Sequence, residues 1–269
     1  MNRQFGWVAG SIFSLVTFGS ALAADLPLKA PPAPLPPAVY NWSGGYIGGN
    51  IGWANSSGGS GETCTSGPAT SVGCAIVPDS GLHANGALAG VQSGYNWQSG
   101  MWVYGIESDF QVSHVKGSSL AIGTFPDVGG GFSPPASYSA DQNMDWFGTT
   151  RGRIGAAFNN VLIYGTGGVM YGEVQTTQNL QFNSGIIFPA QSNTIRSGWV
   201  GGGGIEWAVV QSLSLKFEGL YYDLGSITTA ATQVPGTSTF TNFKTFGFHG
   251  AIARVGFNYK LDPPVVAKY

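Results

Sequence analysis

Residues 102–110, WVYGIESDF, decide the fold class of this chain. Four of the five even positions carry large apolar side chains, whereas the acidic residues Glu107 and Asp109 both occupy odd positions. The apolar set is Trp102, Tyr104, Ile106 and Phe110. Successive side chains of a β-strand point to opposite faces. The stretch therefore predicts a strand with one apolar face and one charged face.

Eight segments repeat this alternation between turn-forming residues, which predicts eight strands. We expect them at residues 42–53, 84–97, 102–114, 145–158, 161–174, 196–209, 213–224 and 246–261. Segment 161–174 is ambiguous, because apolar residues occur there at both parities. The connections alternate between short ones, at 98–101, 159–160 and 210–212, and long ones, at 55–83, 115–144, 175–195 and 225–245. Such alternation is typical of outer-membrane barrels, which have short periplasmic turns and longer extracellular loops.

The composition indicates that a large surface avoids water without helical membrane spans. Charged residues make up 9% of the 269 residues, against about 25% in soluble domains. The 43 glycines have no three-residue period, which excludes collagen, and a 43% hydrophobic share excludes a disordered polar chain. A mean hydropathy near zero argues against a helical membrane protein. The net charge of −2 argues against a nucleic-acid partner.

The tryptophans decide which face of each strand meets lipid. Outside the N-terminal stretch they lie at segment ends, where an interfacial girdle would place them. Those next to short connections are Trp42, Trp97, Trp102 and Trp207, and those near long connections are Trp53, Trp146 and Trp199. Two girdles predict outward apolar faces. The fold class is therefore all-β, an eight-stranded antiparallel up-and-down transmembrane β-barrel.

Outward apolar faces place eight charged residues inside the barrel. They are Glu107, Asp109, Glu206, Glu218, Arg151, Arg153, Lys216 and Arg254, four of each sign. Strand neighbours should form two groups, one on the third and fourth segments and one on the sixth to eighth. An eight-stranded barrel is just wide enough for its own side chains, so we expect paired charges that plug the lumen. A narrow pore lined by the same charges is the alternative.

The N-terminal residues read as an export signal followed by a spacer. Residues 5–22 are uncharged and end in the small-residue pattern Ala21-Leu22-Ala23, which predicts a signal peptide at 1–23. Residues 24–41 are rich in proline and predict an extended periplasmic tail. The barrel is expected at 42–261 and a C-terminal tail at 262–269.

Cysteine and histidine do not predict a reactive site. Cys64 and Cys74 lie close together in an exported chain, so a local disulfide is expected. The histidines His83, His114 and His249 share parity with outward residues. No recognisable nucleophile motif or metal-ligand set accompanies them. We therefore expect no enzymatic activity, no cofactor and no metal.

Several motifs carry a family resemblance that covers nearly all of residues 42–260. They are WSGGYIGGNIGW (42–53), GYNWQ (94–98), YGIESDF (104–110), GTTRGRIG (148–155) and RVGFNYK (254–260). The chain resembles the small porin-like, immunogenic outer-membrane proteins of Gram-negative bacteria, which are distantly related to the OmpA transmembrane domain. The resemblance implies a role in envelope integrity, surface antigenicity or limited permeability and, in some members, haem binding.

The expected function is that of a non-enzymatic structural and surface-exposed protein of the outer membrane. A narrow porin is the first alternative, and a receptor or haem-binding protein acting through the long loops is the second. Expected partners are outer-membrane lipid, lipopolysaccharide and, during biogenesis, the barrel-assembly machinery. That machinery would read a terminal aromatic residue, either Tyr259 or Tyr269. The oligomeric state is left open.

Overall fold

The computed structural model describes residues 40–58, 63–66, 73–75, 82–124, 135–183, 185, 187–232 and 241–261. The predicted signal peptide, most of the proline-rich tail and the C-terminal tail with Tyr269 lie outside these residues. The described residues contain no helix that is long and apolar enough to cross a membrane.

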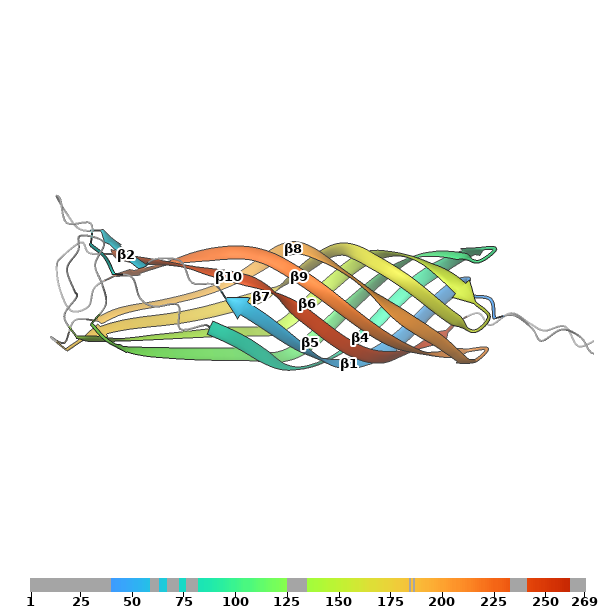
Figure 1. The fold of residues 1–269 in the computed structure, drawn as a ribbon, viewed down its shortest axis with the longest axis horizontal. Coiled ribbons are helices and arrows are strands. Elements are labelled where there is room, and N and C mark those ends of the chain that lie inside the picture. The colour runs from blue at the N-terminus through green and yellow to red at the C-terminus, as the bar shows by residue number, and fades with distance from the viewer. Residues whose placement is uncertain are drawn as a thin grey trace, which may run out of the picture. The chain divides into compact units, whose positions relative to one another are not determined.

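Eight long antiparallel strands wind around one axis and close into a barrel (Figure 1). They are β1 (Gly44–Gly58), β4 (Leu82–Ser99), β5 (Trp102–Gly123), β6 (Ala136–Phe158), β7 (Val161–Phe182), β8 (Ile187–Val210), β9 (Leu213–Thr232) and β10 (Thr241–Lys260). Each pairs with the next along the chain, and β1 pairs with β10 to close the ring. The predicted up-and-down eight-stranded barrel is confirmed.

Two short strands, β2 (Thr63–Ser66) and β3 (Gly73–Ala75), extend this sheet at the end with the long connections. β2 pairs with β10 beyond the point where β1 ends. Cys64 lies directly opposite Cys74 in the β2–β3 ladder. This register is compatible with the predicted disulfide, which remains a prediction.

The strands are longer than the sequence pattern indicated at the long-loop end. β7 continues to Phe182 and β8 begins at Ile187, so most of the predicted 175–195 loop is strand. β5, β6, β9 and β10 are extended in the same way. In the extension of β7, the buried residues Thr176, Gln178 and Leu180 alternate with less buried neighbours. Both faces carry polar residues, so the amphipathic contrast by which strands are recognised disappears.

Inward and outward faces follow the predicted parity. Along β7, where the pattern was ambiguous, Leu162 and Met170 are completely buried, whereas Ile163 and Val169 are about half exposed. The outward faces of all eight strands carry exposed apolar or aromatic side chains. The barrel thus has an apolar outer wall around a filled interior.

Five of the seven predicted girdle tryptophans are outward and exposed, namely Trp53, Trp97, Trp102, Trp199 and Trp207. Trp146 is only partly exposed, because its ring stacks on Phe110 and its indole N–H donates to Glu173. Trp42 does not belong to a girdle, since it is 3% exposed. It precedes the strand, which begins at Gly44 with a φ of 125°, so strand parity does not apply to it.

The interior is layered along the barrel axis. At the short-turn end lies a small cluster that includes Tyr40, Trp42 and Leu162. Towards the long-loop end lies a larger apolar cluster that includes Phe147, Leu220 and Phe248. The charged residues lie between the two, as the order Val103, Glu107, Asp109, Val115 along β5 illustrates.

The barrel wall divides into two sheets at the long-loop end. The β8–β9 ladder runs only from Val210 and Leu213 to Trp199 and Asp223, although both strands continue. A register shift in the neighbouring β9–β10 ladder accompanies this divergence. Arg196 of β8 still donates a hydrogen bond to the Ser226 carbonyl of β9. Beyond it, β5–β8 form one sheet, and β9, β10, β2 and β3 form the other.

A pair of leucine truncations tests this placement of the core. Leu220→Ala should lower the free energy of unfolding by about 2–5 kcal/mol, because Leu220 is 3% exposed within the larger apolar cluster. Leu120→Ala should change it by about 0.5 kcal/mol or less, because Leu120 is 65% exposed. Equilibrium urea unfolding in detergent micelles measures both. If both variants lowered the free energy of unfolding equally, the hydrophobic core could not be confined to the lumen.

Candidate functional site

All eight charged residues predicted for the interior lie in one layer of the lumen. Each is at most 5% exposed. They come from β5, β6, β8, β9 and β10: Glu107, Asp109, Arg151, Arg153, Glu206, Lys216, Glu218 and Arg254. Because water is excluded, each charge depends on the protein for its partners.

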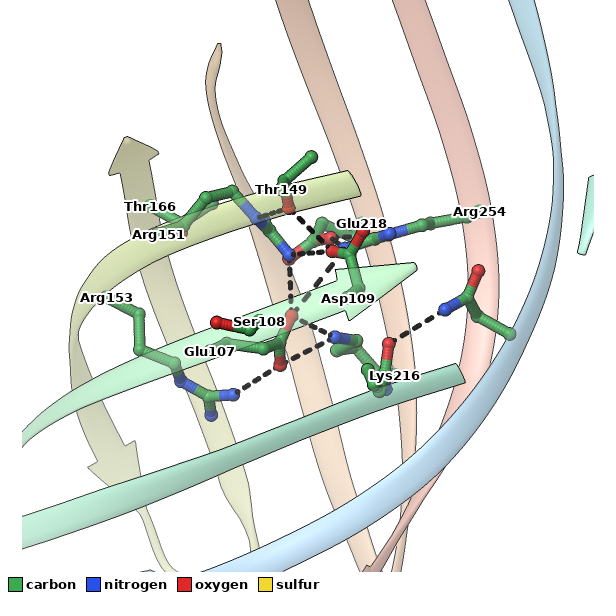
Figure 2. A network of polar contacts seen from close by, with 12 residues as sticks. Glu107, Ser108, Asp109, Thr149, Arg151, Arg153, Thr166, Lys216, Glu218 and Arg254 are labelled. Carbon is green, nitrogen blue, oxygen red and sulfur yellow. Dashed lines mark hydrogen bonds and ion pairs between the residues drawn. The ribbon is translucent and has the colours of Figure 1, made fainter. Parts of the chain in front are cut away.

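Glu107 is the hub of this network, and Figure 2 shows cations approaching it from several strands. Its Oε1 lies 2.6 Å from Arg151 Nη2 and 2.8 Å from Lys216 Nζ. Arg153 Nη1 is 3.4 Å from Oε2, and Arg254 Nη2 is 3.6 Å from Oε1. The Tyr46 hydroxyl also donates to Oε2, at 2.9 Å. One carboxylate therefore holds four cations.

Asp109 and Glu218 bind two of the same cations on the long-loop side of the layer. Arg254 Nη2 lies 2.9 Å from Asp109 Oδ2 and 2.6 Å from Glu218 Oε2. Arg151 Nη2 lies 3.1 Å from Asp109 Oδ2, and its Nη1 lies 3.1 Å from Glu218 Oε1. The Thr149 hydroxyl donates to Asp109 Oδ2 at 2.7 Å. Each arginine thus bridges at least two carboxylates.

Glu206 extends the network towards the short-turn end. Arg153 Nη2 lies 2.7 Å from Glu206 Oε2, while Ser214 and Asn258 donate to Oε1 at 2.6 and 2.8 Å. Asn258 in turn accepts from Gln92 Nε2 at 2.6 Å. Polar side chains therefore carry the network from β8 across β10 to β4.

Two tyrosines and two glycines position Arg153. Its guanidinium lies 4.5 Å from the ring centre of Tyr164 and 5.5 Å from that of Tyr46, within the range of cation–π attraction. A Cβ at Gly94 would lie 2.4 Å from the Tyr46 hydroxyl, and one at Gly204 would lie 2.6 Å from the Tyr164 hydroxyl. Backbone oxygens are as close, with Ile106 O 2.6 Å from a Cβ at Gly94 and Phe217 O 2.5 Å from one at Gly204, so a side chain at either position would displace the barrel wall as well as the tyrosine.

The structure joins the two groups that strand adjacency predicted. Glu107 and Arg151 are cross-strand partners, as are Glu218 and Arg254. The contact between Glu107 and Lys216 crosses the lumen and links the groups. Parity could not foresee that link, because it specifies a face and not the neighbours across a closed barrel.

Sequence reasoning missed several members of the site. The uncharged members Tyr46, Tyr164, Gln92 and Asn258 occupy inward positions of their strands, but only the charges were followed. Lys260 is also buried. It donates to the Asn41 carbonyl at 2.6 Å, and its Nζ lies 5.6 Å from the Tyr40 ring. Strand parity with Arg254 could have identified it.

Aromatic side chains pack inside the lumen at the short-turn end. Tyr40 and Trp42 pack edge to face, with ring centres 4.6 Å apart. The space lined by these residues, Glu206 and Lys260 has a volume of about 10 Å³, roughly that of one water-sized probe. Burial, with a smaller contribution from the Glu206 carboxylate, raises the pKa of Tyr40 to about 12, so its hydroxyl stays protonated.

In this arrangement each of the eight charged groups forms an ion pair with at least one group of opposite charge. Within the described part of the chain, no three His, Cys, Asp or Glu residues are grouped so that they could hold a metal ion. His83 and His114 are exposed on the outer wall, and His249 is partly exposed.

Removal of the hub should destabilise the barrel strongly. Glu107→Gln leaves four cations without their shared carboxylate, so the free energy of unfolding should fall by about 3–5 kcal/mol. Glu173→Gln is the matched control, since Glu173 is only partly buried and accepts one hydrogen bond from Trp146. In this control the free energy of unfolding should fall by less than about 1 kcal/mol. Urea unfolding in micelles measures both variants. If the two substitutions lowered the free energy of unfolding equally, Glu107 would not be the central residue of the network.

Comparison with known proteins agrees with this architecture. The family model described as an outer membrane protein β-barrel domain matches residues 11–261. A 31 kDa outer-membrane immunogenic protein of Brucella melitensis is 35% identical over 90% of this chain and 94% of its own length. A 25 kDa outer-membrane immunogenic protein of the same organism is 28% identical over 90% and 91%.

Among solved structures, the outer membrane protein OprG of Pseudomonas aeruginosa matches with 14% identity and a TM-score of 0.48, over 83% of this chain and 99% of that one. The family match rests on the sequence relatives and on the family model, which spans most of the chain. This chain belongs to the outer-membrane β-barrel family and is a protein of the bacterial outer membrane.

Proposed function

We propose that this protein is a closed, non-enzymatic barrel that reinforces the outer membrane and displays its long-loop end at the cell surface. The observation that carries the proposal is the charge network. Four acidic and four basic side chains fill the lumen between two apolar clusters. A water-filled path would have to replace these buried ion pairs.

The long-loop end supports the surface role. A strand of about 9–11 residues is enough to span the bilayer, whereas β7 and β8 have 22 and 24 residues. On β8, Trp199 marks one girdle and Trp207 the other. Residues from Ile187 to Gly198 therefore extend beyond the membrane. We propose that this extension holds the loops away from the lipid surface, where antibodies or other partners reach them.

The outer wall and the last strand suggest the remaining partners. The exposed apolar band faces outer-membrane lipid, and lipopolysaccharide would surround it in the outer leaflet. Tyr259 lies on β10 with its ring 49% exposed and pairs with Ile47 and Leu213. We propose that the assembly machinery reads this aromatic residue.

One set of residues could be mistaken for a hydrolase triad. Ser57 lies in register between His83 and His249, and Asp223 lies opposite His249. Within the described residues, no hydrogen bond joins the Ser57 hydroxyl to either imidazole, and Asp223 instead accepts from the Gly225 amide. A serine without a paired base is a weak nucleophile, which supports the non-enzymatic proposal.

Planar-bilayer recording tests whether the lumen is closed. The purified wild-type barrel should give no steady unitary currents, because paired charges and two apolar clusters fill its interior. Glu107→Ala should give brief openings, since it removes the carboxylate around which four cations gather. Steady currents from the wild type would contradict a plugged lumen and support the narrow-pore alternative.

Surface display is tested by cysteine labelling of intact cells. Ser118 and Ser99 are exposed on the outer wall, towards the long-loop and short-turn ends respectively. Ser118→Cys should react with a membrane-impermeant maleimide, whereas Ser99→Cys should react only after the outer membrane is permeabilised. The wild type supplies the baseline for Cys64 and Cys74. The reverse pattern would place the long loops in the periplasm.

A further inference from the structure

Among the described residues, the band of the outer wall between the two tryptophan girdles has one polar interruption. Between the tryptophans of the two ends, outward positions on all eight strands carry apolar or aromatic side chains, or glycine, with three exceptions. The exceptions are Ser93, Ser108 and Thr150. Lipid tails have no hydrogen-bonding groups, so hydroxyls facing them are unfavourable unless they find partners.

The three hydroxyl-bearing residues form a single row across three strands. Ser93 of β4 lies opposite Ser108 of β5, and Ser108 lies opposite Thr150 of β6. Ser108 Oγ and Thr150 Oγ1 are 3.1 Å apart, so one hydroxyl donates to the other. Ser93 has no side-chain hydrogen bond among the described residues. The row therefore retains unused donors and acceptors.

A hollow of about 710 Å³ lies over Ser93 and Ser108 of this row, and Thr150 is not among its lining residues. Its walls are bulky and mostly aromatic, and include Phe110, Tyr171, Phe257 and Tyr259. Its floor is formed by small residues, among them Gly49, Ser93 and Ser108. The wall therefore has both a recess and projecting rings, which could interlock with a matching surface.

We propose that Ser93, Ser108 and Thr150 form the centre of a contact with a second copy of this chain in the plane of the membrane. Membrane-embedded interfaces favour small residues that allow close approach, with Ser and Thr hydrogen bonds across them. A hydroxyl both donates and accepts, so the same residue on each copy can pair with itself. An acyl chain would fill the recess but leave the hydroxyls unpaired.

The membrane restricts the symmetry of such a pair. Both copies insert in the same direction, so a two-fold axis must run along the membrane normal. Residues close to that axis meet their own counterparts in an isologous contact. Ser108 is the middle residue of the row. In the proposed dimer it lies at the two-fold axis. Phe110, two residues along β5 and also outward, would enter the recess of the other copy.

Cysteine cross-linking in outer-membrane vesicles tests this arrangement. Ser108→Cys should form a disulfide-linked dimer on mild oxidation, and reduction should reverse it. Gly219→Cys is the control, because Gly219 is outward on β9, four strands away around the ring, and a Cβ there meets no atom within 4 Å. The yield of cross-linked dimer from Ser108→Cys should be several-fold higher than the yield from the control or from the wild type. Equal yields would overturn the proposal.

A second measurement separates the contact from folding. The triple variant Ser93→Ala, Ser108→Ala, Thr150→Ala removes only three outward hydroxyls and should keep the heat-modifiable mobility of a folded barrel. Native mass spectrometry from nanodiscs should show dimers for the wild type and a several-fold smaller dimer fraction for the variant. A monomeric wild type would contradict the proposal. A monomer carrying a lipid that the variant loses would assign the hollow to that lipid instead.

Discussion

The barrel depends on the neutralisation of buried charge around Glu107. Four cations from β6, β9 and β10 converge on this carboxylate, at distances from 2.6 to 3.6 Å. None of them can reach water, so each must be paired where it lies. The same requirement explains the surrounding residues. Tyr46, Thr149, Ser214 and Asn258 supply hydrogen bonds to the carboxylates, and glycines at positions 94 and 204 leave space for the tyrosines.

This constraint also connects the interior to the function. A lumen filled by reciprocal ion pairs, with apolar clusters on both sides, supports the proposed closed barrel. Under the proposed function, the protein acts through its outer surfaces. The long-loop extension reaches past the girdle at Trp199, and the lipid-facing wall carries a single polar row at Ser93, Ser108 and Thr150. The first surface meets the environment, and the second meets the membrane.

Much of this architecture could be predicted from residue order, because a strand has only two faces. Glu107 and Asp109 on one parity, opposed by Tyr104 and Phe110 on the other, specify which side chains share a face. Other features could not be predicted in that way. The pattern ended β7 too early, since Thr176 and Gln178 are buried although polar. Trp42 is predicted for the girdle because it lies at a segment end, whereas it precedes the first residue of β1 and is buried.

The sequence by itself determined the eight strands, their order, their two faces and the inward position of the eight charged residues of the network, because these depend on period and on neighbours along the chain. Only the tertiary structure decided which charges meet across the lumen. Lys216 reaches Glu107, and Arg254 reaches Asp109, because closure of β1 against β10 brings opposite walls within side-chain reach. It also decided that the wall divides beyond Trp199, where the β8–β9 ladder ends although both strands continue.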